Sequence, residues 1–356
     1  MLPYFIVMSL ATLIVFLEGD STNRRSPLRS ARVSALWLVL LTIFVGARLD
    51  VGGDWGAYEQ RVDALRGAEL ASILTWDPAY DLLNWITANS INGNVVFVNL
   101  VCAAIFVSGL LAFCRSLPRP SLALQLALPY LVFVVGMGYT RQATAIGGIM
   151  LALAVVSASA TLRPLMLMAL AALFHKATAI FIPTLWWASS ELSSTRRVVI
   201  LCVAGIAIAL LLAPTAEYSI TRYLTEDWAS TGAPIRGSLN LVAAMIFLWF
   251  SSELPIATEQ KNIFRIFAVG ICGLSVLLLV SPTSTIVDRM GLFFLPFQIA
   301  VFSCLPNLLE NRGLSTSITT ALLVIFAWCQ LTVWLYFSPF AQSWLPYQNA
   351  FFMQLA

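Results

Sequence analysis

Residues 48–58, RLDVGGDWGAY, interrupt a sequence that is otherwise mostly apolar. The apolar run from Ala35 to Ala47 ends here, and the next residues include one arginine, two aspartates, three glycines, a tryptophan and a tyrosine. Gly52 and Gly53 permit backbone conformations that other residues avoid, so amides and carboxylates can converge on a ligand. The same composition also fits a helix end followed by an interfacial loop with an aromatic anchor. The stretch is therefore either a ligand-binding site or a loop at the membrane surface.

The composition of the whole chain indicates a polytopic membrane protein. Of its 356 residues, 60% are hydrophobic and 10% are charged, whereas about 25% of residues are charged in soluble domains. The net charge of +3 includes no basic block of the kind that binds nucleic acid, so the expected surroundings are a lipid bilayer and not nucleic acid. The six cysteines lack metal-ligand spacing and the outer loops lack a DxD motif, so we expect no metal and no cofactor.

Ten apolar segments have the length of a membrane-spanning helix, which is roughly 17 to 25 residues. They lie near 2–17, 34–50, 94–114, 121–138, 141–160, 198–214, 238–252, 264–281, 290–306 and 317–338. The segment 165–188 differs, because His175-Lys176 divides it into halves of about ten residues that are too short to cross. The sequence predicts one all-α transmembrane domain over 1–356, with a re-entrant helical hairpin whose tip, His175, faces a cavity.

Lysine and arginine residues in the short loops predict the orientation. With the loops 18–33, 115–120, 160–164, 189–197, 252–265 and 306–316 in the cytoplasm, most of the 20 basic residues lie inside. The loops 51–93, 215–237 and 339–356 then cap the opposite, periplasmic face, where both termini also lie. Within the first of these loops we expect a short helix near 58–70 and another that begins at Pro78, with Asp77 as its N-cap and Tyr80 against the membrane interface.

Three arginines at or near the outer helix ends are candidates for binding an anion: Arg48, Arg141 and Arg289. A charge at the centre of a membrane helix costs roughly 2.5 to 3.5 kcal/mol, so such residues usually face a cavity or a partner. Guanidinium groups bind phosphate oxygens bidentately. Arg141 follows Gly138-Tyr139-Thr140 at a helix start, where backbone N–H groups also favour an anion, and this predicts a diphosphate site. Taken singly, each arginine also fits an interfacial residue that reaches the headgroups.

These residues also resemble those of a known family. An arginine followed by V-G-x-D-W/Y and then a tyrosine, at the outer end of the second membrane helix, is similar to the pattern of the EpsG family, Wzy-like polymerases of bacterial exopolysaccharides and O-antigens. The resemblance extends to Arg141-Gln142, to Phe174-His175 and to Arg289 before a late helix. It implies a glycosyltransferase of the bacterial inner membrane that polymerises polyprenyl-diphosphate-linked oligosaccharide repeat units on the periplasmic face. A chain-length regulator and a flippase are its implied partners.

The resemblance suggests roles for particular residues. Asp54 or His175 would orient or deprotonate the acceptor hydroxyl, with Asp50 and Asp288 as weaker carboxylate candidates, and Arg141 would stabilise the leaving diphosphate. The candidates for substrate binding are Arg48, Asp50, Trp55, Tyr58, Tyr139, Gln142 and Arg289. Two structural alternatives stay open: an ion pair between Asp54 and Arg48 that holds the loop, and a packing role for His175.

Two other functions are compatible with the same features. A transporter or flippase for a glycolipid or another anion would use the arginines to hold cargo, although transporters commonly have paired broken helices and this chain shows one broken segment. A lipid-linked glycan ligase would share the donor chemistry and differ only in its acceptor.

Overall fold

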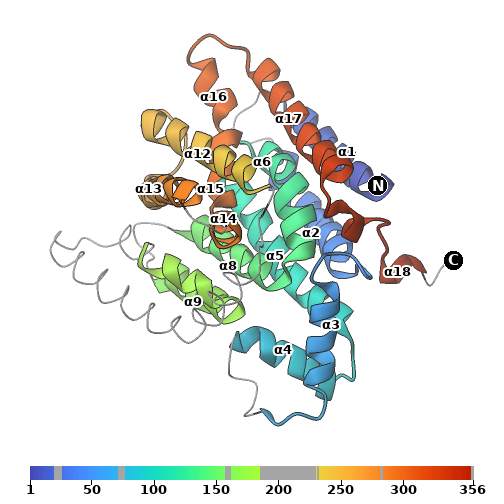
Figure 1. Cartoon of the computed structure of the whole chain (residues 1–356). Coiled ribbons are helices and arrows are strands. Elements are labelled where there is room, and N and C mark those ends of the chain that lie inside the picture. Colours follow the sequence, from blue (N-terminus) through green and yellow to red (C-terminus); the bar gives the residue numbers. More distant parts are fainter. Residues whose placement is uncertain are drawn as a thin grey trace.

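The computed structural model describes residues 1–19, 26–70, 77–156, 162–184, 230, 232–280 and 284–353, and within these ranges the regular elements are helices (Figure 1). Six helical segments are long and apolar enough to span a bilayer. They are α5 (Val95–Ser116), Pro120–Gly138, α12 (Ala233–Phe250), α13 (Thr258–Val280), Ser284–Glu310 and α17 (Thr316–Phe337). The predicted class, an all-α membrane protein, is confirmed.

Two of these spans are composite helices. Pro120–Gly138 consists of α6 (Pro120–Ala127), the π-helical η3 (Leu128–Val135) and α7 (Gly136–Gly138). Ser284–Glu310 consists of α14 (Ser284–Gly291), η5 (Leu292–Phe294), α15 (Leu295–Ser303) and α16 (Leu305–Glu310). A proline near the start of η3, Pro129, cannot donate a helical hydrogen bond, which accounts for the widened turns there.

Four apolar helices are shorter than these spans: α1 (Leu2–Glu18), α2 (Ala31–Gly46), α8 (Thr140–Val155) and α9 (Leu162–Phe174). Every predicted span except 198–214 falls on one of the long or short helices. The segment 198–214 lies outside the described residues, as do most of the predicted loop 215–237 and the loop 189–197. The total of ten spans therefore stays a prediction.

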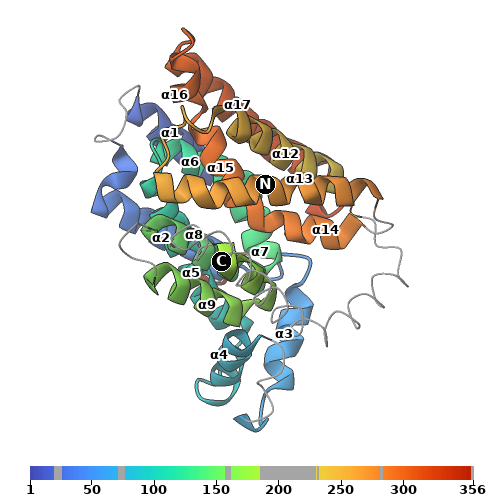
Figure 2. The same ribbon diagram turned by 90° about the vertical axis from the view of Figure 1, so that its left-hand side faces the viewer.

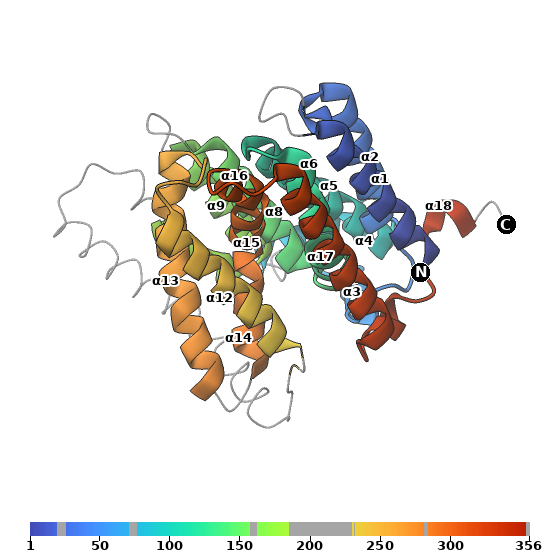
Figure 3. The same ribbon diagram turned by 90° about the horizontal axis from the view of Figure 1, so that it is seen from above.

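The centre of the bundle is the composite helix Pro120–Gly138, of which 94% is buried inside the protein. By contrast, only 28% of α12 and α13 is buried, and these two helices lie along one flank, while α1 and α2 lie on the opposite side (Figure 3). Apolar side chains that the protein leaves uncovered on such helices are suited to lipid. The central helix therefore forms the core, and α12 and α13 form a lipid-facing wall.

Helices α2, α5, α8 and α9 pack side by side through small residues. A Cβ atom added at Gly109 of α5 would collide with the carbonyl of Gly147 in α8, and one added at Gly148 would collide with Ala171 of α9. The backbones are thus in direct contact, as is common between membrane helices. This close packing fixes α9 against α8 and so positions the residues at the end of α9.

Hydrogen bonds between helix ends define two faces of the bundle. At one face, Glu18 accepts hydrogen bonds from Ser26 Oγ at 3.0 Å and from the amide of Ser121 at 2.9 Å. At the other face, Tyr4 Oη donates to the carbonyl of Trp344 at 2.9 Å. We call this second face, which also carries the loop 48–58 and the start of α8, the site end. Hydrogen bonds also connect several loops that were predicted to share the first face: Arg29 donates to Leu117, Gln260 to Ser116 and Arg119 to Asn307.

Two helices project from the site end, α3 (Trp55–Ala64) and α4 (Pro78–Asn89) (Figure 2). Helix α3 overlaps the helix predicted near 58–70 but begins and ends earlier, and α4 begins at Pro78 as predicted. Tyr80, however, does not lie on a membrane interface: it is 2% exposed and packs edge-on against Tyr58, with ring centroids 6.0 Å apart. Burying both rings against one another removes more apolar surface from water than an interfacial position would.

The predicted break at His175 is observed. Helix α9 ends at Phe174, His175 has extended backbone angles (φ −155°, ψ 104°), and η4 (Lys176–Phe181) follows. Helix α9 brings this break to the site end. The returning half of the proposed hairpin continues past 184 into residues that are not described, so the re-entrant path stays a prediction.

Candidate functional site

The loop 48–58 is held between the start of α8 and the C-terminal segment, which comprises η6 (Ala341–Trp344) and α18 (Ala350–Met353). The amide of Gly52 donates to the carbonyl of Ser343 at 2.8 Å, and the amide of Leu49 donates to Gln348 at 3.0 Å. Gly52 has a φ of +109°, and a Cβ atom there would collide with the carbonyl of Met137. Only glycine fits this position without strain.

Arg48 is buried at the base of this loop, with 1% of its surface exposed. Its guanidinium donates to the carbonyls of Val45 at 2.6 Å and Val51 at 3.0 Å, and to Thr140 Oγ1 at 2.8 Å. Trp55, also buried, lies against it, with the guanidinium carbon 5.9 Å from the ring centroid. Among the described residues Arg48 forms no ion pair with Asp54. The arginine therefore joins α2, its following loop and α8, and it does not line open space.

Arg141, at the start of α8, is instead accessible, with 41% of its side chain exposed. Its Nη1 atom lies 2.8 Å from Asp77 Oδ2, and its guanidinium carbon lies 5.8 Å from the centroid of the Tyr80 ring. Asp77 occupies the N-cap position of α4, as predicted, but its side chain does not cap that helix. The other carboxylate oxygen, Oδ1, accepts the amide hydrogen of Lys176 at 3.0 Å.

Asp77 is thus a site residue that the sequence analysis assigned only to a helix start. Burial raises its pKa, but the contacts with His175, Arg141 and the amide of Lys176 outweigh burial, so the pKa of Asp77 lies below its ordinary value. His175 Nδ1 lies 3.8 Å from Asp77 Oδ2. The imidazole stacks on Phe293 of η5, with centroids 5.8 Å apart and an interplanar angle of 12°. One carboxylate therefore links three segments that are distant in sequence.

Arg289, near the end of α14, lies on the other side of the start of α8. Its guanidinium carbon is 5.4 Å from the centroid of the Tyr139 ring, and its backbone carbonyl accepts a hydrogen bond from Gln142 Nε2 at 2.7 Å. Within the described part of the chain no carboxylate lies within ion-pair distance of Arg289. Its neighbour Asp288 forms an ion pair with Arg236, whose Nε donates to Asp288 Oδ1 at 2.7 Å.

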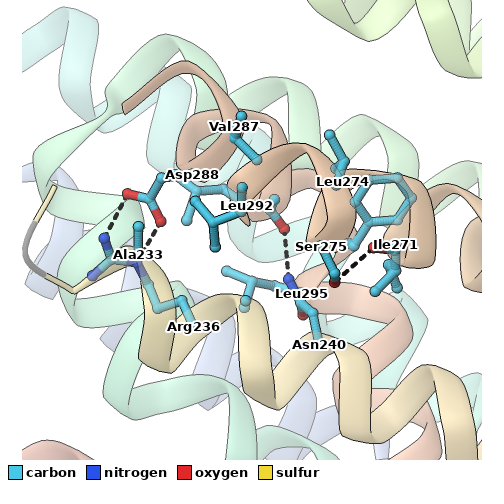
Figure 4. A pocket seen from close by; sticks show the side chains of 14 residues that line it. Ala233, Arg236, Asn240, Ile271, Leu274, Ser275, Val287, Asp288, Leu292 and Leu295 are labelled. Atoms are coloured by element: carbon cyan, nitrogen blue, oxygen red, sulfur yellow. Dashed lines mark hydrogen bonds and ion pairs between the residues drawn. The ribbon is translucent and has the colours of Figure 1, made fainter. Parts of the chain in front are cut away.

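Asp288 and Arg236 lie at one end of a pocket between α12, α13 and α14 (Figure 4). Most of the remaining lining is apolar. Farther along, Asn240 Nδ2 donates to the carbonyl of Gly291 at 3.1 Å. Arg289 follows the pocket-lining residue Asp288 on helix α14.

Asp54 is half-buried at the N-terminus of α3. Burial raises its pKa, while Arg289 and Arg141 act in the opposite direction, which places both arginines within electrostatic range of this carboxylate. The pKa of Tyr58 is raised to about 12 by burial and by Asp54. Asp50, in contrast, is exposed, with a φ of +47°.

We call the following residues the site cluster: Asp54, Asp77, Tyr139, Arg141, His175 and Arg289. Five of them were predicted as site residues, and Asp77 was predicted only as an N-cap. No group of three or more His, Cys, Asp or Glu side chains with metal-binding geometry occurs among the described residues.

The fold and this cluster define a polytopic membrane protein with a cationic site at one end of its helix bundle. A protein-family model, described as the EpsG family, matches residues 33–349 and thus most of the chain. The chain belongs to the EpsG family, a family of Wzy-like polymerases. No curated protein and no solved structure matches it.

Proposed function

We propose that this protein is a glycosyltransferase of the bacterial inner membrane that polymerises polyprenyl-diphosphate-linked oligosaccharide repeat units on the periplasmic face. In each cycle a hydroxyl oxygen of the acceptor unit bonds to the anomeric carbon of the donor glycan. The bond from that carbon to the diphosphate breaks, and the polyprenyl diphosphate leaves with the electron pair. The hydroxyl proton passes to a base of the protein.

The observation that carries this proposal is the arrangement of Arg141, Arg289 and Asp54 at one end of the bundle. Both guanidinium groups counteract the effect of burial on the pKa of the Asp54 carboxylate, so both lie within electrostatic range of it. Two guanidinium groups can bind phosphate oxygens and stabilise the charge that develops on a leaving diphosphate. A carboxylate near these two arginines can orient or deprotonate an acceptor hydroxyl.

The remaining predicted residues receive supporting roles in this proposal. Tyr139 presents its ring to Arg289, and Gln142 binds the backbone of Arg289, so both hold this guanidinium in place. Arg48 and Trp55 maintain the loop that carries Asp54 and Tyr58, and Arg48 does not bind phosphate in this assignment. Asp50 is exposed on the same loop and can contact the glycan.

A reconstitution experiment tests the proposal. Purified protein in vesicles, supplied with polyprenyl-diphosphate-linked repeat units and no nucleotide sugar, should produce a ladder of longer lipid-linked glycans. Arg312→Lys is a suitable control for Arg141→Lys, because Arg312 lies on the opposite face, paired with Glu253 at 2.9 Å. Arg141→Lys should lose most of the activity, since lysine keeps the charge but loses the planar fork.

The alternatives give different results in the same experiment. A transporter or flippase would move the lipid-linked glycan across the vesicle membrane without extending it. A ligase would transfer the glycan to a different acceptor lipid and would not lengthen the repeat units. Either result would reject the polymerase proposal.

A further inference from the structure

Two side chains lie near the same oxygen of the Asp77 carboxylate. Oδ2 forms the ion pair with Arg141 Nη1 at 2.8 Å, and the same oxygen lies 3.8 Å from His175 Nδ1. Oδ1 already accepts the amide hydrogen of Lys176 at 3.0 Å. His175 Nδ1 is buried and has no hydrogen-bond partner among the described residues.

The surroundings of His175 limit how it can move. Its ring lies flat against Phe293, and its backbone adjoins Lys176, whose amide is bonded to Asp77. A shift of less than about 1 Å would bring Nδ1 from 3.8 Å to within hydrogen-bond distance of Asp77 Oδ2. Among the described residues, the charged groups around this histidine are Asp77, its chain neighbour Lys176 and Arg141, which pairs with the same carboxylate.

We propose that Asp77 is a positioning residue that exchanges partners during the reaction. At rest its Oδ2 atom holds Arg141, and when a diphosphate draws Arg141 away, Oδ2 accepts a hydrogen bond from His175 Nδ1–H instead. A neutral imidazole carries one N–H, and the bond made by one ring nitrogen decides the state of the other. The exchange thus leaves the lone pair on Nε2. This inference rests on the proposed function and adds a residue and an order of events to it.

The exchange makes His175 a base only when a leaving group is bound. As the acceptor oxygen bonds to the anomeric carbon and the diphosphate departs with its electron pair, the hydroxyl proton passes to His175 Nε2. The imidazolium that forms faces the Asp77 carboxylate, which stabilises its charge. Without a diphosphate the Asp77 oxygen stays with Arg141, and Nε2 is not held as a proton acceptor.

The chain contains a single histidine, so one spectroscopic signal reports on this exchange. Protein with ¹⁵N-labelled imidazole, purified without a histidine tag and studied above the titration range of imidazole, gives ring nitrogen shifts that identify the tautomer. Arg141→Gln should shift His175 toward the Nδ1–H tautomer without any ligand. A short polyprenyl diphosphate that carries no sugar should cause the same shift in the wild type.

Asp77→Asn should abolish the response to the diphosphate. The matched control is Asp81→Asn, which removes a carboxylate from the same helix α4, where Asp81 pairs with Arg61 at 2.8 Å. This control should respond like the wild type.

Unchanged ring shifts in Arg141→Gln would overturn the proposal, as would a wild-type response to diphosphate in Asp77→Asn. If Asp77→Asn cannot be purified, Arg141→Gln still decides the question. The two proposals fail separately: glycan extension with an unchanged tautomer rejects only the exchange, and a tautomer change without glycan extension rejects only the polymerase.

Discussion

The guanidinium carbon of Arg289 lies 5.4 Å from the centroid of the Tyr139 ring, so an arginine of α14 is oriented by the residue that precedes α8. A contact between a guanidinium and an aromatic face contributes about 0.5 to 2 kcal/mol. We expect Tyr139→Leu to reduce polymerisation by roughly 2- to 30-fold, which corresponds to this energy range. Tyr139→Phe should retain most activity, because the ring remains. Initial rates of glycan extension at saturating lipid-linked substrate provide the measurement.

Arg312 supplies the control, since it also lies over an aromatic ring, with its guanidinium carbon 4.5 Å from the Phe250 centroid on the opposite face. Phe250→Leu should leave the extension rate unchanged. Equal losses in Tyr139→Leu and Phe250→Leu would show that these contacts only support the fold.

A second prediction concerns the backbone of the loop 48–58. Gly52→Ala places a Cβ atom against the carbonyl of Met137 at a φ of +109°, and such positions cost of order 1 to 3 kcal/mol. We expect a lower thermal transition in detergent and a lower yield of folded protein. Gly56→Ala is the control, because no atom lies within 4 Å of its added Cβ and alanine favours the helix. A Gly52→Ala variant as stable as Gly56→Ala would contradict the described packing.

The orientation in the membrane gives a third prediction. In a cysteine-free background, Ala57→Cys at the site end should react with an impermeant thiol reagent added from the periplasm, whereas Asn311→Cys on the opposite face should not. Both positions are exposed. Ser26, in the predicted cytoplasmic loop 18–33, is unsuitable because it is buried and its hydroxyl donates to Glu18. Periplasmic labelling of Asn311→Cys would place the site cluster in the cytoplasm and reject the proposed reaction there.

The sequence predicted most helices because apolar length is a local property, and membrane helices need it individually. It also predicted the break at His175, since the polar pair His175-Lys176 divides an apolar run. What it missed depends on contacts between distant segments. Asp77 looked like a helix cap because Asp-Pro at a helix start is a local signal, whereas its partners Arg141 and His175 are brought to it by the packing of α8 and α9.

For Arg48 the sequence made the converse error: it indicated a site residue, whereas contacts with other segments give this arginine a structural position. From the sequence, an arginine at a membrane helix end is suited to bind an anion as well as to reach the interface. The fold surrounds it instead with backbone carbonyls, whose positions are set by a loop conformation that the sequence pattern does not specify. The three arginines predicted as a group therefore differ in environment: Arg48 is buried, while Arg141 and Arg289 are partly exposed.

This difference yields the last prediction, which separates folding from chemistry. In Arg48→Lys, a single ammonium replaces a planar fork that donates to two carbonyls and to Thr140, so at least one buried acceptor loses its partner. A buried polar group without its hydrogen bond costs about 1 to 3 kcal/mol. We expect a clear fall in thermal stability in detergent, with extension activity lost in proportion to folded protein.

Arg141→Lys should behave in the opposite way, because its side chain is 41% exposed and its charge remains next to Asp77: stability should stay near the wild-type value while the extension rate falls. Measuring thermal stability and extension rate for both variants shows whether each arginine supports the fold or binds phosphate. An Arg48→Lys protein with wild-type stability but no activity would indicate that Arg48 also binds phosphate.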